Sequence, residues 1–189
     1  ALVVYNSNPA VIAPNQTLCK IDGNARILLS AERPALNFLQ TLSATATVTR
    51  RYVDAIQGTG AVIMDTRKTL PGLRLAQKYA VKVGGGENQR TGLFDGILIK
   101  ENHILAAGGI AAVLAQAQRA APPGVSVQIE VESLDELEQA LSAGARLILL
   151  DNFSLADMRQ AVISTARRAL LEASGGITMA GVRAIAATG

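Results

Sequence analysis

Short apolar runs alternate with helical apolar patterns through most of the chain. Five nearly continuous apolar runs have the length of buried strands, and they lie at 61–65, 97–100, 125–131, 146–151 and 169–173. Each is followed by apolar residues at helical spacing, at about 73–83, 104–120, 134–143, 155–167 and from Ser174 to about 187. Strands without polar alternation, each followed by a helix, predict a parallel sheet that is buried on both faces.

The first part of the chain has a different pattern. Residues 1–29 contain short strand-like runs interrupted by proline and by Asn/Asp/Gly turns, as at Pro9. A long helix is predicted from about residue 30 to 56, with Pro34 in its first turn, where a missing N–H costs nothing. Residues 1–29 alone are too few to bury a core of their own.

Polar side chains recur where the predicted strands end. These are Thr66-Arg67-Lys68, Lys100, Glu130, Asp151 and Ser174. In an α/β barrel the carboxyl ends of all strands open onto one face, and that face carries the active site. The sequence therefore predicts a single pocket with several cations, two acids and a glycine turn, which favours an enzyme.

Each of these groups has a structural and a functional interpretation. Arg67 and Lys68 are either surface charges or the fork and point charge of an anion site. Lys100 either extends to solvent from the strand end, or contacts a phosphate or forms a Schiff base. His103, the single histidine, is either a structural hydrogen-bonding residue or a base, and the sequence leaves this open.

The acids and glycines are ambiguous in the same way. Glu130 and Asp151 are either buried partners of the cations or ligands of Mg²⁺, which typically takes one or two carboxylates plus substrate phosphates. The turn Ser174-Gly175-Gly176 is predicted to open a helix, where backbone N–H groups either bind an anion or are simply capped by Ser174. Three glycines at 84–86 either end a helix or indicate a close backbone approach.

Composition narrows the possibilities. Hydrophobic residues make up 49% and charged residues 17%, so the 189 residues can build a packed core. The net charge of +3 and the two isolated arginine pairs do not suggest nucleic-acid binding. A single cysteine, Cys19, fits a reducing compartment. No run is long enough for a membrane span and no basic signal region is visible, so we expect a cytoplasmic protein.

Longer segments carry a family resemblance. They are ERPALNFLQTLS (32–43), DTRKTLPGLR (65–74), KYAVKVGGGENQRTGLFDGILIKENHI (78–104), IEVESLDEL (129–137), LILLDN (147–152) and EASGGI (172–177). Together and in this order they resemble the quinolinate phosphoribosyltransferase family. Members often have Asn-His-Arg where this chain has Asn88-Gln89-Arg90, and glutamine cannot become cationic.

The resemblance implies a fold and an assembly. It implies part of an N-terminal α/β sandwich domain with the start of a linking helix at 1–45, and an incomplete parallel α/β barrel at 46–189. The chain lacks an initiator methionine and ends after a helix, so we expect both ends, including the last barrel strand, to lack residues of a longer protein. Family members form homodimers or hexamers, which implies that Arg33 reaches a neighbour's active site.

The resemblance also implies residue roles. Thr66, Arg67, Lys68, Gln89, Arg90 and Lys100 would bind the substrates quinolinate and phosphoribosyl pyrophosphate. Glu130 and Asp151 would bind ribose hydroxyls and Mg²⁺, and Ser174, Gly175 and Gly176 would bind the 5′-phosphate. Lys68, Lys100, Glu130 and Asp151 would be catalytic.

The expected reaction is phosphoribosyl transfer to quinolinate with decarboxylation, giving nicotinate mononucleotide, CO₂ and pyrophosphate for de novo NAD biosynthesis. The alternatives are an aldolase-type barrel with a Schiff base at Lys100, a related enzyme that uses another substrate such as nicotinate, and a binding module without activity.

Overall fold

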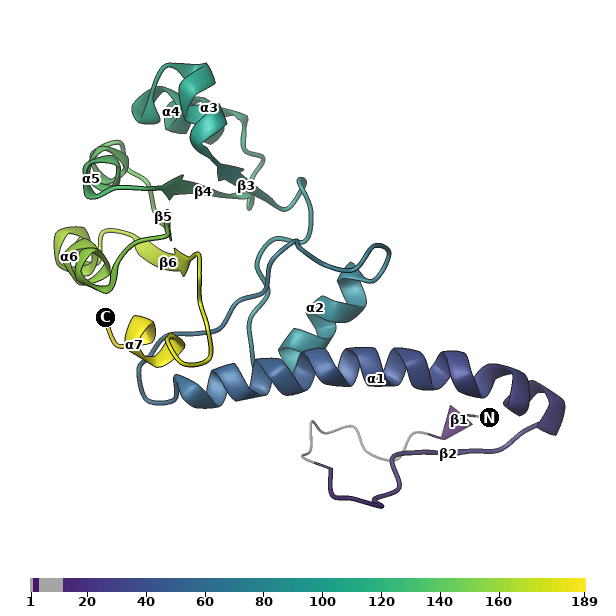
Figure 1. Cartoon of the computed structure of the whole chain (residues 1–189). Coiled ribbons are helices and arrows are strands. Elements are labelled where there is room, and N and C mark those ends of the chain that lie inside the picture. The colour runs from purple at the N-terminus through teal and green to yellow at the C-terminus, as the bar shows by residue number, and fades with distance from the viewer. Residues whose placement is uncertain (1, 4–11) are drawn as a thin grey trace.

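The computed structural model describes residues 2–3 and 12–189 (Figure 1). The strands are β1 (Leu2–Val3), β2 (Lys20–Ile21), β3 (Gly96–Ile99), β4 (Ser126–Val131), β5 (Leu147–Asp151) and β6 (Leu170–Ser174). The helices are α1 (Ala25–Ala55), α2 (Arg74–Val83), α3 (Glu101–Ala107), α4 (Ile110–Ala120), α5 (Leu134–Ser142), α6 (Leu155–Thr165) and α7 (Val182–Ala186). None of the helices in these ranges is both long and apolar enough to span a bilayer.

Strands β3 to β6 form one sheet in the order β3-β4-β5-β6, and every neighbouring pair is parallel. Helices α3 to α6 connect successive strands and lie along one side of the sheet (Figure 1). The predicted α/β class with a parallel sheet is therefore confirmed, and its carboxyl ends share one edge. Strands β1 and β2 form a separate antiparallel pair.

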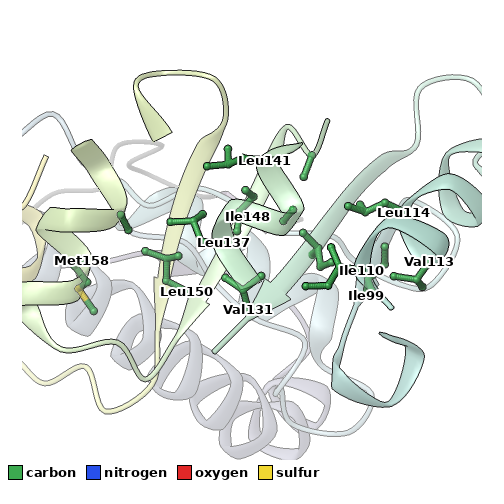
Figure 2. Close-up of a cluster of buried hydrophobic side chains, with 14 residues drawn as sticks. Ile99, Ile110, Val113, Leu114, Val131, Leu137, Leu141, Ile148, Leu150 and Met158 are labelled. Atoms are coloured by element: carbon green, nitrogen blue, oxygen red, sulfur yellow. The ribbon is translucent and has the colours of Figure 1, made fainter. Parts of the chain in front are cut away.

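The core fills the space between the sheet and these helices (Figure 2). Ile129 and Val131 of β4 and Ile148 of β5 are 0% exposed. They pack in one cluster with Leu114 of α4 and Leu137 of α5. This face supplies most of the apolar burial, at roughly 1.5–3 kcal/mol for each large side chain that is fully buried.

Serine caps fix the start of two of these helices. The Ser133 hydroxyl accepts a hydrogen bond from the Glu136 N–H at 3.2 Å, and the Glu136 carboxylate accepts one from the Glu132 N–H at 2.8 Å. This pattern closely resembles a capping box and stops the chain from continuing β4. Ser154 caps α6 in the same way through the Asp157 N–H.

The long N-terminal helix is present but begins earlier than predicted. Asn24 caps it by accepting hydrogen bonds from two backbone N–H groups, so α1 starts at Ala25. Pro34 consequently lies inside the helix and not in its first turn. Of the strand-like runs expected at 1–29, only β1 and β2 occur in the described residues, and the run around Pro9 lies outside them.

Two predicted elements differ in the structure. Residues 61–65 are not a strand, because they make only a single isolated bridge, between Met64 and Glu87, and Val62 is 63% exposed. The helix predicted over 104–120 is divided into α3 and α4. Gly108 and Gly109 have positive φ angles of 81° and 130°, which end α3 and separate it from α4.

The turn after β6 is also different from the prediction. Ser174-Gly175-Gly176 does not open a helix, because α7 begins only at Val182. The proposed contribution of a helix N-terminus at this turn is therefore wrong. Gly175 is required for packing, since its φ is 92° and a Cβ atom would lie 2.0 Å from the Asn152 Oδ1.

The glycine run at 84–86 lets two helices approach each other. A Cβ atom on Gly84 would lie 2.5 Å from the Ala46 carbonyl oxygen, and one on Gly86 would lie 2.9 Å from the Thr49 Cγ2. Both contacts are to α1, which packs on α2 at this point (Figure 1). The close backbone approach suggested by the three glycines is therefore an approach to helix α1 of the same chain.

Candidate active site

The inner face of the sheet, opposite the core, is polar. Successive residues of a strand point to opposite faces, so Gln128 and Glu130 lie opposite Ile129 and Val131. In the register of the sheet, Glu130 pairs with Leu149 of β5, which in turn pairs with Glu172 of β6. This arrangement brings carboxylates and amides from separate strands onto one surface.

Lys100 and Glu130 form an ion pair at the carboxyl ends of β3 and β4. The Lys100 Nζ donates hydrogen bonds to both Glu130 carboxylate oxygens, at 2.9 and 2.7 Å. The side chain of Glu130 is 11% exposed, whereas that of Lys100 is 45% exposed. The nearly buried Glu130 carboxylate is thus held by Lys100, while the Lys100 ammonium is also exposed to solvent, where it can contact an anion.

His103 has a structural contact in this region. Its Nδ1 accepts a hydrogen bond from the backbone N–H of Lys100 at 3.0 Å, at the start of α3. The imidazole therefore fixes the backbone that carries the Lys100 side chain.

Asp151 and Ser174 end two adjacent strands. They are register partners across β5 and β6, and the Ser174 carbonyl oxygen accepts the Asn152 N–H at 2.9 Å. The Asp151 Oδ2 accepts a hydrogen bond from the Asn152 amide at 2.8 Å. The structure therefore places these two predicted residues side by side, with Gly175 and Gly176 following directly.

Arg67 and Arg90 form the second part of the site. Burial of Arg90 lowers the pKa of its guanidinium, and the nearby charge of Arg67 lowers it further, while Asp95 acts in the opposite direction. The Arg67 Nε is buried without a hydrogen-bond partner. Two like charges and an unpaired donor are unfavourable together, but they are suited to binding an anion.

Carboxylates do not neutralise these two arginines. In the part of the chain that the structure describes, none of the ion pairs involves Arg67 or Arg90. The Arg90 guanidinium instead donates to the Gly96 carbonyl oxygen at 3.1 Å, beside the start of β3. Lys100 follows the end of the same strand, so the backbone of Lys100 lies about 13 Å along β3 from Gly96.

A buried ion pair holds the loop that carries Arg67. Lys78 is 2% exposed, and its Nζ lies 2.5 Å from the Asp65 Oδ1 and 2.7 Å from the Gln89 carbonyl oxygen. Arg74 donates to the carbonyl oxygens of Arg67 and Thr91. The sequence interpretation named none of Asp65, Lys78 and Arg74 as site residues, although all three lie in its matching segments.

Lys68 and Thr66 line a small cavity of about 110 Å³. The Thr66 hydroxyl accepts the backbone N–H of Lys68 at 3.0 Å, which shapes the turn. Asp65 and Lys78 lie in the wall of the same cavity. Lys68 is exposed, so its ammonium is accessible from solvent.

Gln89 connects the two parts of the site. Its side-chain amide donates to Gln128 on β4 and to Glu172 on β6. Gln128 and Glu172 were missed by sequence reasoning. The available signal was a polar residue inside an otherwise apolar strand, which is costly unless the residue has a partner.

Arg33 is not brought to the other predicted residues. It lies on the exposed N-terminal half of α1, which extends away from the sheet (Figure 1). Within the described ranges its side chain makes no hydrogen bond or ion pair with another residue of the chain.

The carboxylates of the site suit magnesium only with help from a substrate. The described residues contain no cluster of three or more acidic, histidine or cysteine side chains that could hold a metal. Glu130 and Asp151 nevertheless offer hard oxygen ligands at one edge of the sheet. One or two carboxylates plus substrate phosphates and water are an ordinary Mg²⁺ environment.

Two family models match the chain. The C-terminal domain of quinolinate phosphoribosyl transferase matches residues 45–189, and the N-terminal domain of the same protein matches residues 8–43. The boundary between the two matches falls inside α1, which is continuous from Ala25 to Ala55.

Known proteins match over nearly the whole chain. Nicotinate-nucleotide pyrophosphorylase (carboxylating) of Mycobacterium leprae is 48% identical over 95% of the chain, and its probable counterpart in Bacillus subtilis is 40% identical over 99%. The solved nicotinate-nucleotide pyrophosphorylase of Francisella tularensis superposes with a TM-score of 0.95 at 46% identity. The match covers 100% of the present chain and 67% of the Francisella chain. The chain spans 64% and 65% of the two curated relatives.

Proposed function

The chain belongs to the quinolinate phosphoribosyltransferase family, and we propose that it transfers a phosphoribosyl group from 5-phosphoribosyl 1-pyrophosphate to quinolinate with decarboxylation. The products are nicotinate mononucleotide, CO₂ and pyrophosphate, on the de novo route to NAD. The protein is then a pentosyltransferase. The observation that carries this proposal is the proximity of Arg67 to Arg90, two cations that form no ion pair within the described residues, together with the Lys100–Glu130 pair at the ends of β3 and β4.

Both substrates are polyanions, which the distribution of cations suits. Arg67 and Arg90 hold the two carboxylates of quinolinate, since a guanidinium binds a carboxylate through two parallel hydrogen bonds. Thr66, Lys68 and Lys100 bind the phosphoribosyl pyrophosphate, with Lys68 and Lys100 as point charges on the pyrophosphate. Holding the two anions together converts a bimolecular encounter into an oriented one.

The reaction breaks two bonds and needs no covalent enzyme intermediate. The ring nitrogen of quinolinate attacks C1 of the ribose, and the bond from C1 to the pyrophosphate oxygen breaks with its electron pair. The resulting pyridinium stabilises the carbanion formed when the adjacent carboxylate leaves as CO₂, and a proton then adds at that carbon. Lys68 and Lys100 stabilise the negative charge that develops on the leaving pyrophosphate.

Glu130 and Asp151 bind the ribose hydroxyls, and with the substrate phosphates they hold Mg²⁺. The ion supplies electrostatic stabilisation of the pyrophosphate when bound. Ser174, Gly175 and Gly176 bind the 5′-phosphate through the Ser174 hydroxyl and backbone N–H groups, without help from a helix N-terminus. Gly176 has nothing within 4 Å of its Cβ position, which leaves this side of the turn open.

Lys100 is better suited to electrostatic work than to Schiff-base chemistry. Its Nζ donates to both oxygens of Glu130, as expected of an ammonium and not of a free amine nucleophile. Borohydride treatment in the presence of substrate should therefore trap no covalent adduct.

The remaining parts of the proposal concern the assembly. We expect residues 1–45 to belong to the N-terminal sandwich domain and 46–189 to an α/β barrel. We also expect a cytoplasmic homodimer or hexamer in which Arg33 serves the active site of a neighbouring subunit. The exposed position of Arg33, remote from its own sheet, supports this arrangement.

The test is product formation by the intact protein. Quinolinate labelled at its 2-carboxylate is incubated with phosphoribosyl pyrophosphate and Mg²⁺, and release of labelled CO₂ and pyrophosphate is measured, with nicotinate as the competing substrate. Equal release of both products that depends on Mg²⁺ is expected. Pyrophosphate release from nicotinate but not quinolinate, or no turnover by folded protein, would overturn the proposal.

A further inference from the structure

Gln89, Gln128 and Glu172 form a hydrogen-bonded triad on the inner face of the sheet. We propose that Gln128 and Glu172 are positioning residues, which act on substrate binding through Gln89 and Arg90. This inference rests on the proposed function, because it concerns the binding of the same dicarboxylate substrate. It adds two residues that the sequence interpretation did not include.

The amide of Gln89 is fully engaged as a donor. Its Nε2 donates to the Gln128 Oε1 at 2.6 Å and to the Glu172 Oε2 at 3.3 Å. The Gln128 Nε2 donates to the same Glu172 oxygen at 2.8 Å. A glutamine amide has two N–H donors, and the protein uses both donors of Gln89.

The acceptor side of the same amide reaches Arg90. The Gln89 Oε1 accepts the backbone N–H of Arg90 at 2.7 Å. The Gln89 backbone is held as well, since its N–H donates to Asp65 at 2.9 Å and its carbonyl oxygen accepts from Lys78 at 2.7 Å. The triad therefore determines where the backbone of Arg90 lies, and Arg90 binds the anion.

The triad contains one charge. Glu172 is its single carboxylate, and two neutral amides face it. The charged groups that contact the backbone or carbonyl side of Gln89 are Asp65, Lys78 and Arg90. Glu130, which is paired with Lys100, lies on the same face of the sheet as Gln128 and Glu172. Because glutamine does not titrate, Gln89 and Gln128 keep the same donors and acceptors between about pH 5 and 8. Gln128 is 8% exposed, so water cannot readily replace its contacts.

Gln128→Glu tests the triad with little change of volume. The substitution removes the donor to Glu172 and places two carboxylates at hydrogen-bond distance, so that one of them has a raised pKa. At high pH the two repel, whereas at low pH one shared proton restores the hydrogen bond. The lost bond involves a charged group, so its removal is expected to weaken binding by about tenfold.

The experiment measures kcat and KM for quinolinate at pH 6 and pH 8 in the intact protein, each divided by the wild-type value at the same pH. We expect the KM of Gln128→Glu to rise by about tenfold at pH 8 and clearly less at pH 6, with kcat changed by less than about threefold. A KM ratio that is unchanged, or equally raised at both pH values, would overturn the proposal.

The matched control is Gln139→Glu. The Gln139 Nε2 also donates to a carboxylate, that of Asp135 at 2.7 Å, but on the exposed surface of α5. The KM ratio of this control is expected to stay near one at both pH values. A pH-dependent ratio like that of Gln128→Glu would mean that the effect does not come from the triad.

A second variant covers the case in which Gln128→Glu does not fold. Gln89→His places an imidazole beside Glu172, and only its protonated form has two N–H donors. Its KM relative to wild type is expected to fall by about threefold between pH 8 and pH 6. A flat ratio in this variant would count against the proposal.

Binding of phthalate, a dicarboxylate without the ring nitrogen, separates this inference from the proposed reaction. Calorimetry with phthalate at pH 6 and 8 needs no turnover. If the wild type binds phthalate and the variants show the expected pH dependence without any turnover of quinolinate, the triad is confirmed and the proposed reaction is wrong. If quinolinate is turned over but neither the KM nor the phthalate affinity of the variants shows the expected pH dependence, the proposed reaction is supported and the inference about the triad is wrong.

Discussion

The two faces of β4 differ completely in chemistry although they belong to the same six residues. On the outer face, Ile129 and Val131 are 0% exposed and pack under the helices (Figure 2). On the inner face, Gln128 and Glu130 make hydrogen bonds to side chains from other elements. Residues that pack the core therefore alternate along the strand with residues of the proposed binding site, and substitutions on the two faces should affect different properties.

The largest effect is expected on the outer face, from Ile129→Ala. Removing buried methyl groups from a close-packed cluster leaves a cavity, so the free energy of unfolding should fall by about 2–5 kcal/mol. Urea denaturation measures this change. The kcat of the remaining folded protein should be close to that of the wild type.

Ile163→Ala is the control for this substitution, because Ile163 lies on α6 and is 69% exposed. Its effect should be below about 0.5 kcal/mol. A loss of less than about 1 kcal/mol in Ile129→Ala would contradict the division between the faces.

On the inner edge, Lys100→Met should reverse the pattern. The substitution removes the ammonium that we propose to face the pyrophosphate, so kcat/KM should fall by about 100-fold. Lys100 is nearly half exposed, but its loss leaves the 11% exposed Glu130 carboxylate without its partner, so the free energy of unfolding should fall by about 1–2 kcal/mol, less than in Ile129→Ala.

Steady-state kinetics and urea denaturation of the same preparation check both parts of this prediction. Lys82→Met is the matched control, because Lys82 forms an exposed ion pair with Glu87 at 2.5 Å outside the site. If Lys82→Met reduced kcat/KM as strongly as Lys100→Met, the effect would reflect net charge and not the position of Lys100.

Arg67→Met sharpens the comparison further, because stability and binding should change in opposite directions. The substitution removes a buried N–H without a partner and a like charge beside Arg90. The protein should become more stable by up to about 1 kcal/mol, while the KM for quinolinate rises by about tenfold. A loss of stability together with an unchanged KM would argue that Arg67 is structural.

The smallest effect is expected from Asp95→Asn, in the loop before β3. Hydrogen bonds from the backbone N–H groups of Gly92 and Thr91 lower the pKa of the Asp95 carboxyl. A lowered folded-state pKa stabilises the protein above the unfolded value of about 3.9, and this contribution is lost as the pH falls through the folded value.

Denaturation of the Asp95→Asn variant at pH 3 and pH 7 tests this sign. The wild type should lose slightly more stability than the variant between pH 7 and pH 3, so that the advantage of the wild type is smaller at the lower pH. A variant that is more stable than the wild type at pH 7 would contradict it.

Local sequence patterns predicted the positions of the strands that pair with one another in the parallel sheet. The strands at 96–99, 126–131, 147–151 and 170–174 are apolar and bounded by turns or caps, so their positions followed from the sequence. The run at 61–65 is equally apolar, but a strand also needs a partner along its length, and here it has only the bridge from Met64 to Glu87. Partner availability is a tertiary property that periodicity does not contain.

The positions of the candidate site residues were predictable at the strand ends, and less so where they depend on contacts between distant segments. Lys100, Glu130, Asp151 and Ser174 could be found because each follows an apolar run. The bond from Gln89 to Glu172 joins residues 83 positions apart, and nothing in either local pattern selects the other. The turn at Ser174 was assigned to a helix because Gly and Ser fit both a loop and a cap.

Helix α1 sets the distance between its anchored C-terminal half and its exposed N-terminal half. It is continuous from Ala25 to Ala55 and is anchored on α2 at Thr49, where glycines admit it closely. Between Thr49 and Arg33 the helix rises by about 24 Å. One inserted residue in this interval would advance Arg33 by about 1.5 Å and turn it by about 100° around the axis. The number of residues between Thr49 and Arg33 therefore determines how far from α2 the Arg33 side chain lies and in which direction around the helix axis it projects.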